Sequence, residues 1–142
     1  MSKYFEVGVR YDKTQEDGTD KKVTETYLID ALSFSEVEKR ITEEMEAYIS
    51  GEFSVVAEKI TNISDVINTD DVLADKFYKV KFSIITVDEK TGKEKKQSQL
   101  IVVKASSNDD ARDRYKQYYK DSPADLVLEA VSETKYIDYI PY

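Results

Sequence analysis

The chain repeats one pattern of elements at an offset of 71 to 74 residues, and this duplication constrains the fold more than any other feature. Residues 31–41 read ALSFSEVEKRI, and residues 105–115 read ASSNDDARDRY. Ser33 followed by Glu36 has the spacing of a capping box, in which the serine hydroxyl accepts a hydrogen bond from a backbone N–H at the start of a helix and the carboxylate reaches back to the serine N–H. The second copy has a serine and an aspartate at the equivalent positions. Both copies therefore predict a turn from a strand into a helix.

The two helix starts differ in their apolar flanks. Leu32 and Val37 flank the first cap as a hydrophobic staple, whereas Ser106 and Ala111 take these positions in the second copy. We therefore predict that the second helix has the weaker start.

Alternating segments precede each helix. Residues 4–11 and 77–87 alternate apolar and polar side chains, which indicates strands with one buried face. A polar stretch that contains glycine follows each of them, and then a second alternating strand, at 23–31 and 97–105. Each pair of strands is predicted to form a hairpin.

The remaining elements also correspond between the copies. The first helix is expected from Phe34 to about Ser50, with Gly51 ending it, and the second from Asp109 to about Asp121. A third strand follows each helix, and a short further strand follows that. These strands are predicted at 53–60, 63–67, 126–132 and 136–140.

The predicted fold class is α+β, a tandem duplication of a β-β-α-β unit with antiparallel hairpins and one helix packed on each sheet. A right-handed crossover places the first strand between the other two, in the order 2-1-3. The boundaries are a first repeat at 1–67, a linker at 68–76 and a second repeat at 77–142, packed with pseudo-twofold symmetry as one compact domain.

Composition lowers the expectation of catalysis. The 142 residues contain no cysteine and no histidine, which excludes disulfides and thiolate nucleophiles and removes the side chain most used for proton transfer near neutral pH. No glycine-rich phosphate loop and no nucleophile elbow is found. We expect a non-enzyme with no catalytic residues, no metal site and no cofactor.

Hydropathy and charge bear on location and partners. No stretch reaches the roughly 18 apolar residues of a membrane span, and the amino terminus lacks a basic segment followed by an apolar run, so we expect a cytoplasmic protein without membrane contact. Residues 1–72 hold 8 Lys and Arg against 17 Asp and Glu, a net charge of −9, whereas residues 73–142 hold 13 against 12, a net charge of +1.

Ordered blocks in both halves resemble a known family. The segments are YFEVGVRYDK, KKVTETYLIDALSFSEVEKRITEEM, ISGEFSV, FYKVKF, ITVDEKTGKEK and the terminal IPY. Together they resemble domain-of-unknown-function family 4494, uncharacterised proteins of Bacteroidetes and their phages. The resemblance implies a small cytosolic bacterial or phage protein and carries over no catalytic residues.

The second repeat is rich in lysine. Its basic residues, with one aromatic side chain near them, are candidates for contact with a single-stranded nucleic acid through phosphate pairing and base stacking. The alternative interpretation is a solvated turn. The candidates are Lys79, Lys81, Lys93, Lys95, Lys96, Lys104 and Phe77.

Three apolar residues fall on the strand face that is predicted to point away from the helices. Leu28, Leu100 and Val102 are either buried between the repeats or form an interaction surface, so the chain is expected to be a monomer or a homodimer. The 11 tyrosines are expected at the edge of the core, with a tyrosine-rich binding surface as the alternative.

Three functions are compatible with these features. We favour an intracellular binding or adaptor module of a bacterium or phage that has a protein partner. The alternatives are a single-stranded nucleic-acid-binding accessory protein for replication or repair, and an acidic DNA mimic that acts against host defence.

Overall fold

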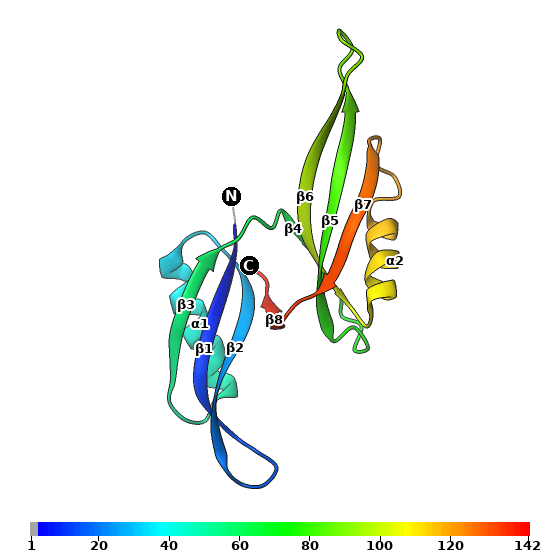
Figure 1. Cartoon of the computed structure of the whole chain (residues 1–142). Coiled ribbons are helices and arrows are strands. Elements are labelled where there is room, and N and C mark those ends of the chain that lie inside the picture. Colours follow the sequence, from blue (N-terminus) through cyan, green and yellow to red (C-terminus); the bar gives the residue numbers. More distant parts are fainter. Residues whose placement is uncertain (1–2) are drawn as a thin grey trace. The chain divides into compact units, whose positions relative to one another are not determined.

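The structure, a computed structural model, describes residues 3–142. Its elements follow the predicted order, strand, strand, helix, strand and short strand, twice (Figure 1). They are β1 (Lys3–Thr14), β2 (Asp20–Ala31), α1 (Phe34–Tyr48), β3 (Phe53–Ile60), β4 (Asp65–Ile67), β5 (Lys76–Val87), β6 (Glu94–Ala105), α2 (Asn108–Tyr118), β7 (Asp125–Glu133) and β8 (Tyr136–Ile140). The predicted α+β class and the β-β-α-β repeat are confirmed.

The chain forms two compact units. Unit 1 comprises the described residues up to Asn62 together with Lys135–Tyr142, and unit 2 comprises Ile63–Thr134. These units differ from the predicted division at residues 67 and 77, because the last strand of each sequence repeat belongs to the other unit.

Unit 1 is a four-stranded sheet in the order β3-β1-β2-β8, with α1 on one face (Figure 1). The order contains the predicted 2-1-3 arrangement. Apolar side chains alternate along β1 and β2 and meet the apolar stripe of α1, which is the period-2 and period-3.6 match that the sequence predicts. The core consists of Phe5, Val7, Val9, Tyr27, Ile29, Ala31, Val37, Ile41, Met45 and Ile140.

Unit 2 repeats this design with the sheet order β4-β6-β5-β7 and α2 on one face. Its helix is more polar, and Tyr115 and Tyr119 pack against Phe82 with ring centroids 5.1 Å away in each case. The core consists of Tyr78, Val80, Phe82, Ile101, Val103, Ala105, Ala111 and Tyr115.

The fourth strand of each sheet comes from the other sequence repeat. β8, which ends the second repeat, pairs in parallel with β2, and β4, which ends the first repeat, pairs in parallel with β6. The paired residues are equivalent, since Asp138 lies opposite Tyr27 and Asp65 lies opposite Ile101. The two repeats therefore exchange their terminal strands.

Matched threonines hold the chain where it leaves each unit. Thr61 donates from its backbone N–H and its hydroxyl to the carbonyl oxygen of Tyr4, at 3.0 and 2.7 Å. Thr134 does the same to the carbonyl oxygen of Phe77, at 2.8 Å in both cases. Each exchanged strand thus begins from a doubly anchored point.

The predicted helix caps are present in both copies, and the second has the shorter cap hydrogen bond. Asp110 N–H donates to Ser107 Oγ at 3.0 Å, against 3.3 Å for Glu36 N–H and Ser33 Oγ. The second carboxylate also accepts two bonds from Ser106, from the N–H at 2.9 Å and the hydroxyl at 3.1 Å. A polar contact therefore takes the place of the missing apolar staple.

The ends of the helices also differ from the prediction. α1 ends at Tyr48, and its cap residue Ile49 is extended, so Gly51 does not terminate the helix. The predicted hairpin glycines do adopt the left-handed backbone conformation, with φ of 86° at Gly18 and 69° at Gly92.

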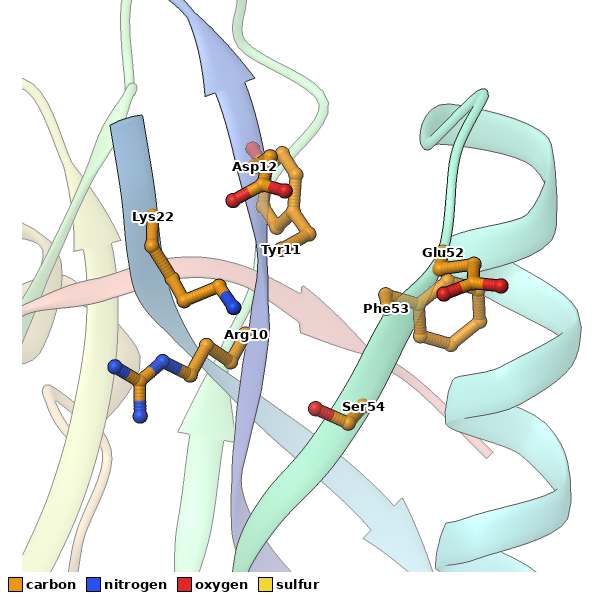
Figure 2. Close-up of a pocket in the computed structure, with 7 residues that line it drawn as sticks. All are labelled: Arg10, Tyr11, Asp12, Lys22, Glu52, Phe53 and Ser54. Carbon is orange, nitrogen blue, oxygen red and sulfur yellow. The ribbon is translucent and has the colours of Figure 1, made fainter. Parts of the chain in front are cut away.

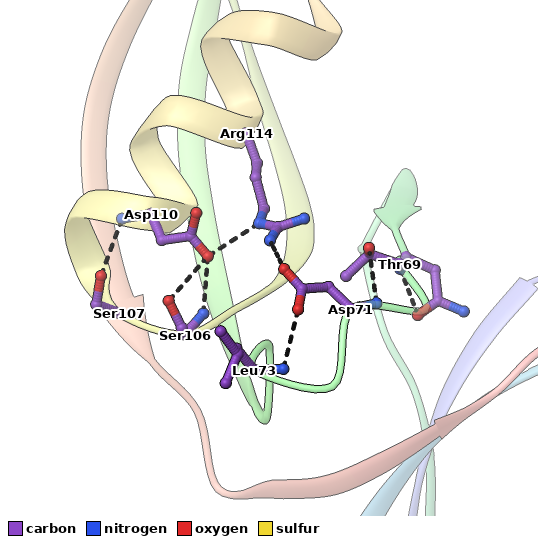
Figure 3. Close-up of polar contacts among 8 residues, drawn as sticks. Thr69, Asp71, Leu73, Ser106, Ser107, Asp110 and Arg114 are labelled. Carbon is purple, nitrogen blue, oxygen red and sulfur yellow. Dashed lines mark hydrogen bonds and ion pairs between the residues drawn. The ribbon is translucent and has the colours of Figure 1, made fainter.

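The predicted linker is partly built into unit 2. Ala74 is buried, and Asp71 accepts hydrogen bonds from Leu73 N–H at 3.0 Å and from Arg114 at 2.9 Å (Figure 3). Arg114 also donates to Asp110 at 2.9 Å, so one guanidinium joins the start of α2 to the segment that follows β4. In unit 1, the equivalent Arg40 donates to the carbonyl oxygen of Pro141, just after β8. Both helices thus hold the chain that follows an exchanged strand.

The Asp110 network predicts a dependence of stability on pH. The backbone N–H of Ser106, and then the Arg114 guanidinium, lower the pKa of Asp110. Because this pKa is below the unfolded value of about 3.9, the network stabilises the protein above about pH 4, and this stability is lost as the pH falls through the folded pKa. We expect Asp110→Asn to flatten the fall in unfolding free energy below about pH 4, measured by urea titration.

Asp109 provides the matched control for this experiment. It is exposed in the same helical turn and makes no side-chain hydrogen bond to a described residue. An equal flattening in Asp109→Asn would contradict the assignment to the network.

Candidate functional site

β2 has an open edge at residues 20–25. β8 pairs with β2 only from Thr26 to Ile29, whereas β1 pairs with it from Asp20 to Ala31. No other described strand pairs with the outer side of residues 20–25. Backbone N–H and C=O groups alternate between the two sides of a strand, so this edge presents unpaired donors and acceptors.

A hollow of about 260 Å³ lies beside this edge, lined by Tyr11, Tyr27, Tyr48, Ile137 and Asp138. Tyr11 and Tyr27 point from the sheet face that α1 covers, and Tyr48 is the last residue of α1. Ile137 and Asp138 come from the exchanged strand. Tyr48 is 74% exposed and Ile137 51%, so their apolar surfaces are open to a ligand. The hollow needs residues from both sequence repeats.

Acidic side chains lie in and beside the hollow. The Tyr11 hydroxyl donates to Glu25 Oε1 at 2.5 Å, and this hydrogen bond, with burial and the charge of Glu25, raises the pKa of Tyr11 to about 12. Burial raises the pKa of Tyr27, and the charges of Glu25 and Asp138 add to this shift. Lys13 Nζ lies 3.9 Å from Glu25, whereas Asp138 has no ion-pair partner among the described residues.

Unit 2 keeps the open edge but replaces the tyrosines that line the hollow. β4 leaves residues 94–99 of β6 unpaired on the outer side, within the described chain. The two sheet tyrosines are replaced by Ile84 and Ile101. Asp65, which corresponds to the aspartate of the hollow, accepts a hydrogen bond from Tyr118 at 3.0 Å. Unit 2 is therefore an internal control for the site in unit 1.

A second hollow of unit 1, of about 190 Å³, is lined by Arg10, Tyr11, Asp12, Lys22, Glu52, Phe53 and Ser54. Figure 2 shows Arg10, Lys22 and Ser54 on one side of the sheet, and the strand register places them on the face away from α1. Neither Arg10 nor Lys22 pairs with a described carboxylate. Two carboxylates and two cations line this hollow, so its charge favours no class of ligand.

The predicted lysines are only partly brought together. Lys79, Lys81, Lys96 and Lys104 share the face of the unit 2 sheet that points away from α2. Lys95 points to the other face, and Lys93 lies in the hairpin loop.

The apolar candidates are less accessible than the sequence suggests. Phe77 is 2% exposed with Lys104 Nζ 5.8 Å from its ring centroid, so the ring is not free to stack on a base. Leu28 and Val102 are each 0% exposed. Leu100 is partly exposed.

Within residues 3–142, no group of three acidic side chains is arranged to hold a metal ion. Neither described helix has the length and apolar character that a membrane crossing requires.

Sequence reasoning identified the individual tyrosines but not the site. The sequence predicts tyrosines at the edge of the core and a short strand at 136–140, which contains Ile137 and Asp138. The only signal was the concentration of tyrosine, because nothing in the sequence shows that the terminal strand joins β2.

Comparison with known proteins identifies the family. A family model described as "Domain of unknown function (DUF4494)" matches residues 3–142. The chain belongs to this family. No curated protein and no solved structure matches it. This match confirms the family that the sequence blocks resemble, and the family description assigns no activity.

Proposed function

We propose that this DUF4494 protein is a non-enzymatic adaptor that binds an extended segment of a protein partner by adding it as a strand to β2. The proposal includes a cytoplasmic location in a bacterium or in a phage-infected cell, which is supported by the hydropathy of the sequence and by the family resemblance. The supporting observation is an unpaired strand edge beside a hollow lined by tyrosines.

Strand addition divides recognition between two sets of contacts. Main-chain hydrogen bonds to residues 20–25 supply affinity without regard to sequence, while a side chain of the added segment enters the tyrosine hollow and supplies specificity. Tyrosine suits this role because it offers a large, stiff apolar surface with a polar end.

The same edge is protected against pairing with a second copy. Lys21 and Lys22 lie within the open segment, and lysines on an edge strand disfavour pairing with a like edge. A partner with complementary charge does not meet this repulsion.

The test is selection of extended peptides on the full-length protein from a displayed library of random heptapeptides. We expect selected peptides to shift the backbone amide NMR signals of residues 20–25 and Tyr48. N-methylation of alternate peptide amides is expected to abolish binding, because it removes main-chain donors.

Variants locate the binding site. Tyr48→Ala is expected to weaken binding about tenfold, equivalent to about 1.4 kcal/mol. Tyr118→Ala, an exposed tyrosine near the end of α2, is the matched control and is expected to leave affinity unchanged. Recovery of no peptide, or of peptides whose shifts map outside unit 1, would exclude this function.

A second candidate function rests on the four lysines that share one face of the unit 2 sheet. If this face binds single-stranded nucleic acid, affinity for an oligodeoxythymidylate should fall steeply with salt. Lys81→Gln with Lys96→Gln should reduce the salt slope, measured by fluorescence anisotropy. Binding that is insensitive to salt would exclude the electrostatic mode.

A further inference from the structure

We infer that the tyrosine hollow of unit 1 receives a cationic side chain, lysine or arginine, of the segment that pairs with β2. This inference rests on the proposed function, because it names the chemistry of the residue that the added strand presents. Neither the family description nor the fold assigns a ligand to the hollow.

The position of the hollow selects one side chain of the added strand. Tyr27 and Glu25 lie on the face of β2 that α1 covers, whereas Lys22 lies on the other face. Successive side chains of a strand point to opposite faces, so only alternate residues of an added segment point toward the hollow. The volume of about 260 Å³ suits one long side chain rather than a group of them.

Charge decides which long side chain fits. Asp138 lines the hollow, and its carboxylate accepts only the adjacent backbone N–H of Tyr139, at 2.8 Å, with no cation beside it in the described chain. Glu25 adds a second negative charge next to Tyr11. Lys13 offsets part of it from 3.9 Å, but its side chain is 55% exposed. The site therefore keeps an uncompensated negative charge.

The aromatic lining favours the same ligand. A lysine ammonium or an arginine guanidinium over a tyrosine ring is attracted by the negative face of the ring, and the alkyl stem packs on the apolar ring surface. Ile137 supplies further apolar surface for that stem. A neutral aliphatic side chain gains the second contact but not the first, and an acidic side chain is repelled by Asp138.

The experiment uses four small probes on the full-length protein, the N-acetyl N′-methylamides of lysine, norleucine, arginine and citrulline. Each pair matches a cation with a neutral side chain of similar length. We expect the cationic member to bind about fivefold to tenfold tighter than its neutral match, from NMR shifts of Tyr48 and Ile137. The lysine and arginine arms show which cation is preferred.

Two variants test whether the preference for cationic probes comes from the hollow or from the overall negative charge of the protein. Asp138→Asn, at an exposed position, is expected to remove most of the preference for the cation. Asp109→Asn, which removes the same charge from an exposed position on α2 of unit 2, is the control and is expected to leave it unchanged. Equal affinity for lysine and norleucine, or an unchanged preference in Asp138→Asn, would overturn the inference.

Failure of this inference and failure of the proposed function are distinguishable. Selected peptides that pair with β2 but show no basic residue would overturn the cationic side chain and leave strand addition intact. Preference for the cationic probes without any peptide that pairs with β2 would support the cation site and exclude strand addition.

Discussion

The Leu28→Asp protein is expected to lose about 4 kcal/mol or more of unfolding free energy, because the substitution buries a carboxylate that has no partner. Leu28 is 0% exposed and lies between Glu6 of β1 and Tyr139 of β8, on the sheet face away from α1. A loss of this size is a large fraction of the stability of a typical domain, so part of the population should be unfolded without denaturant. Urea unfolding followed by circular dichroism measures it.

Thr24→Asp is the matched control for this prediction. Thr24 lies on the same strand and the same face but is exposed, so its substitution is expected to change stability by less than about 0.5 kcal/mol. A Leu28→Asp protein of normal stability that had lost self-association or partner binding would instead make Leu28 part of an open interaction surface.

Ile140→Ala is expected to destabilise the protein by about 2–4 kcal/mol, since it removes a buried side chain and leaves a cavity. Ile140 is 7% exposed and belongs to the core of unit 1, although it lies in the second sequence repeat. The largest NMR shifts should therefore appear in β1, β2 and α1. Urea titration gives the magnitude, and the shift map gives the location.

Ile137→Ala controls for the effect of changing β8 itself. Its side chain is 51% exposed, so the expected loss is below about 0.5 kcal/mol. Shifts from Ile140→Ala that concentrate in β5, β6 and α2 would place the strand in the other sheet.

The helices and most strands were predictable because their signals are local. Alternation over residues 4–11 and the Ser33 cap each depend on neighbours within a few positions. The predicted helix boundaries were wrong where another local conformation competed with the expected one. Gly51 is a typical helix terminator, yet the chain leaves the helix at Ile49 in an extended conformation. At the second cap, Arg114, one turn further on, adds a contact that the cap pattern does not include.

The strand exchange was not predictable from the sequence. The segments ISDVI and YIDYI alternate as strands, but alternation fixes which face is buried and not which sheet the strand joins. The two sheets offer similar edge positions to this strand, because Ile67 and Ile140 occupy equivalent positions beside β6 and β2. The contacts of Thr61 and Thr134 hold the chain just before each exchanged strand, but they are the same in both repeats and carry no signal for the choice of sheet.

The candidate site escaped prediction for the same reason. Tyr48 and Asp138 are 90 positions apart in the chain, and only the exchanged strand brings them to one hollow. The lysine candidates were easier to find but less informative, since lysine is mostly exposed in folded proteins whatever its role.

The most direct test is the measurement of interstrand amide contacts of β8 by NMR on the labelled full-length protein. The account predicts parallel contacts between Leu28 and Tyr139 and between Ile29 and Ile140, with β4 beside Ile101 to Val103. Contacts of Tyr136–Ile140 with β6, and of Asp65–Ile67 with β2, would contradict the exchange and dismantle the tyrosine hollow.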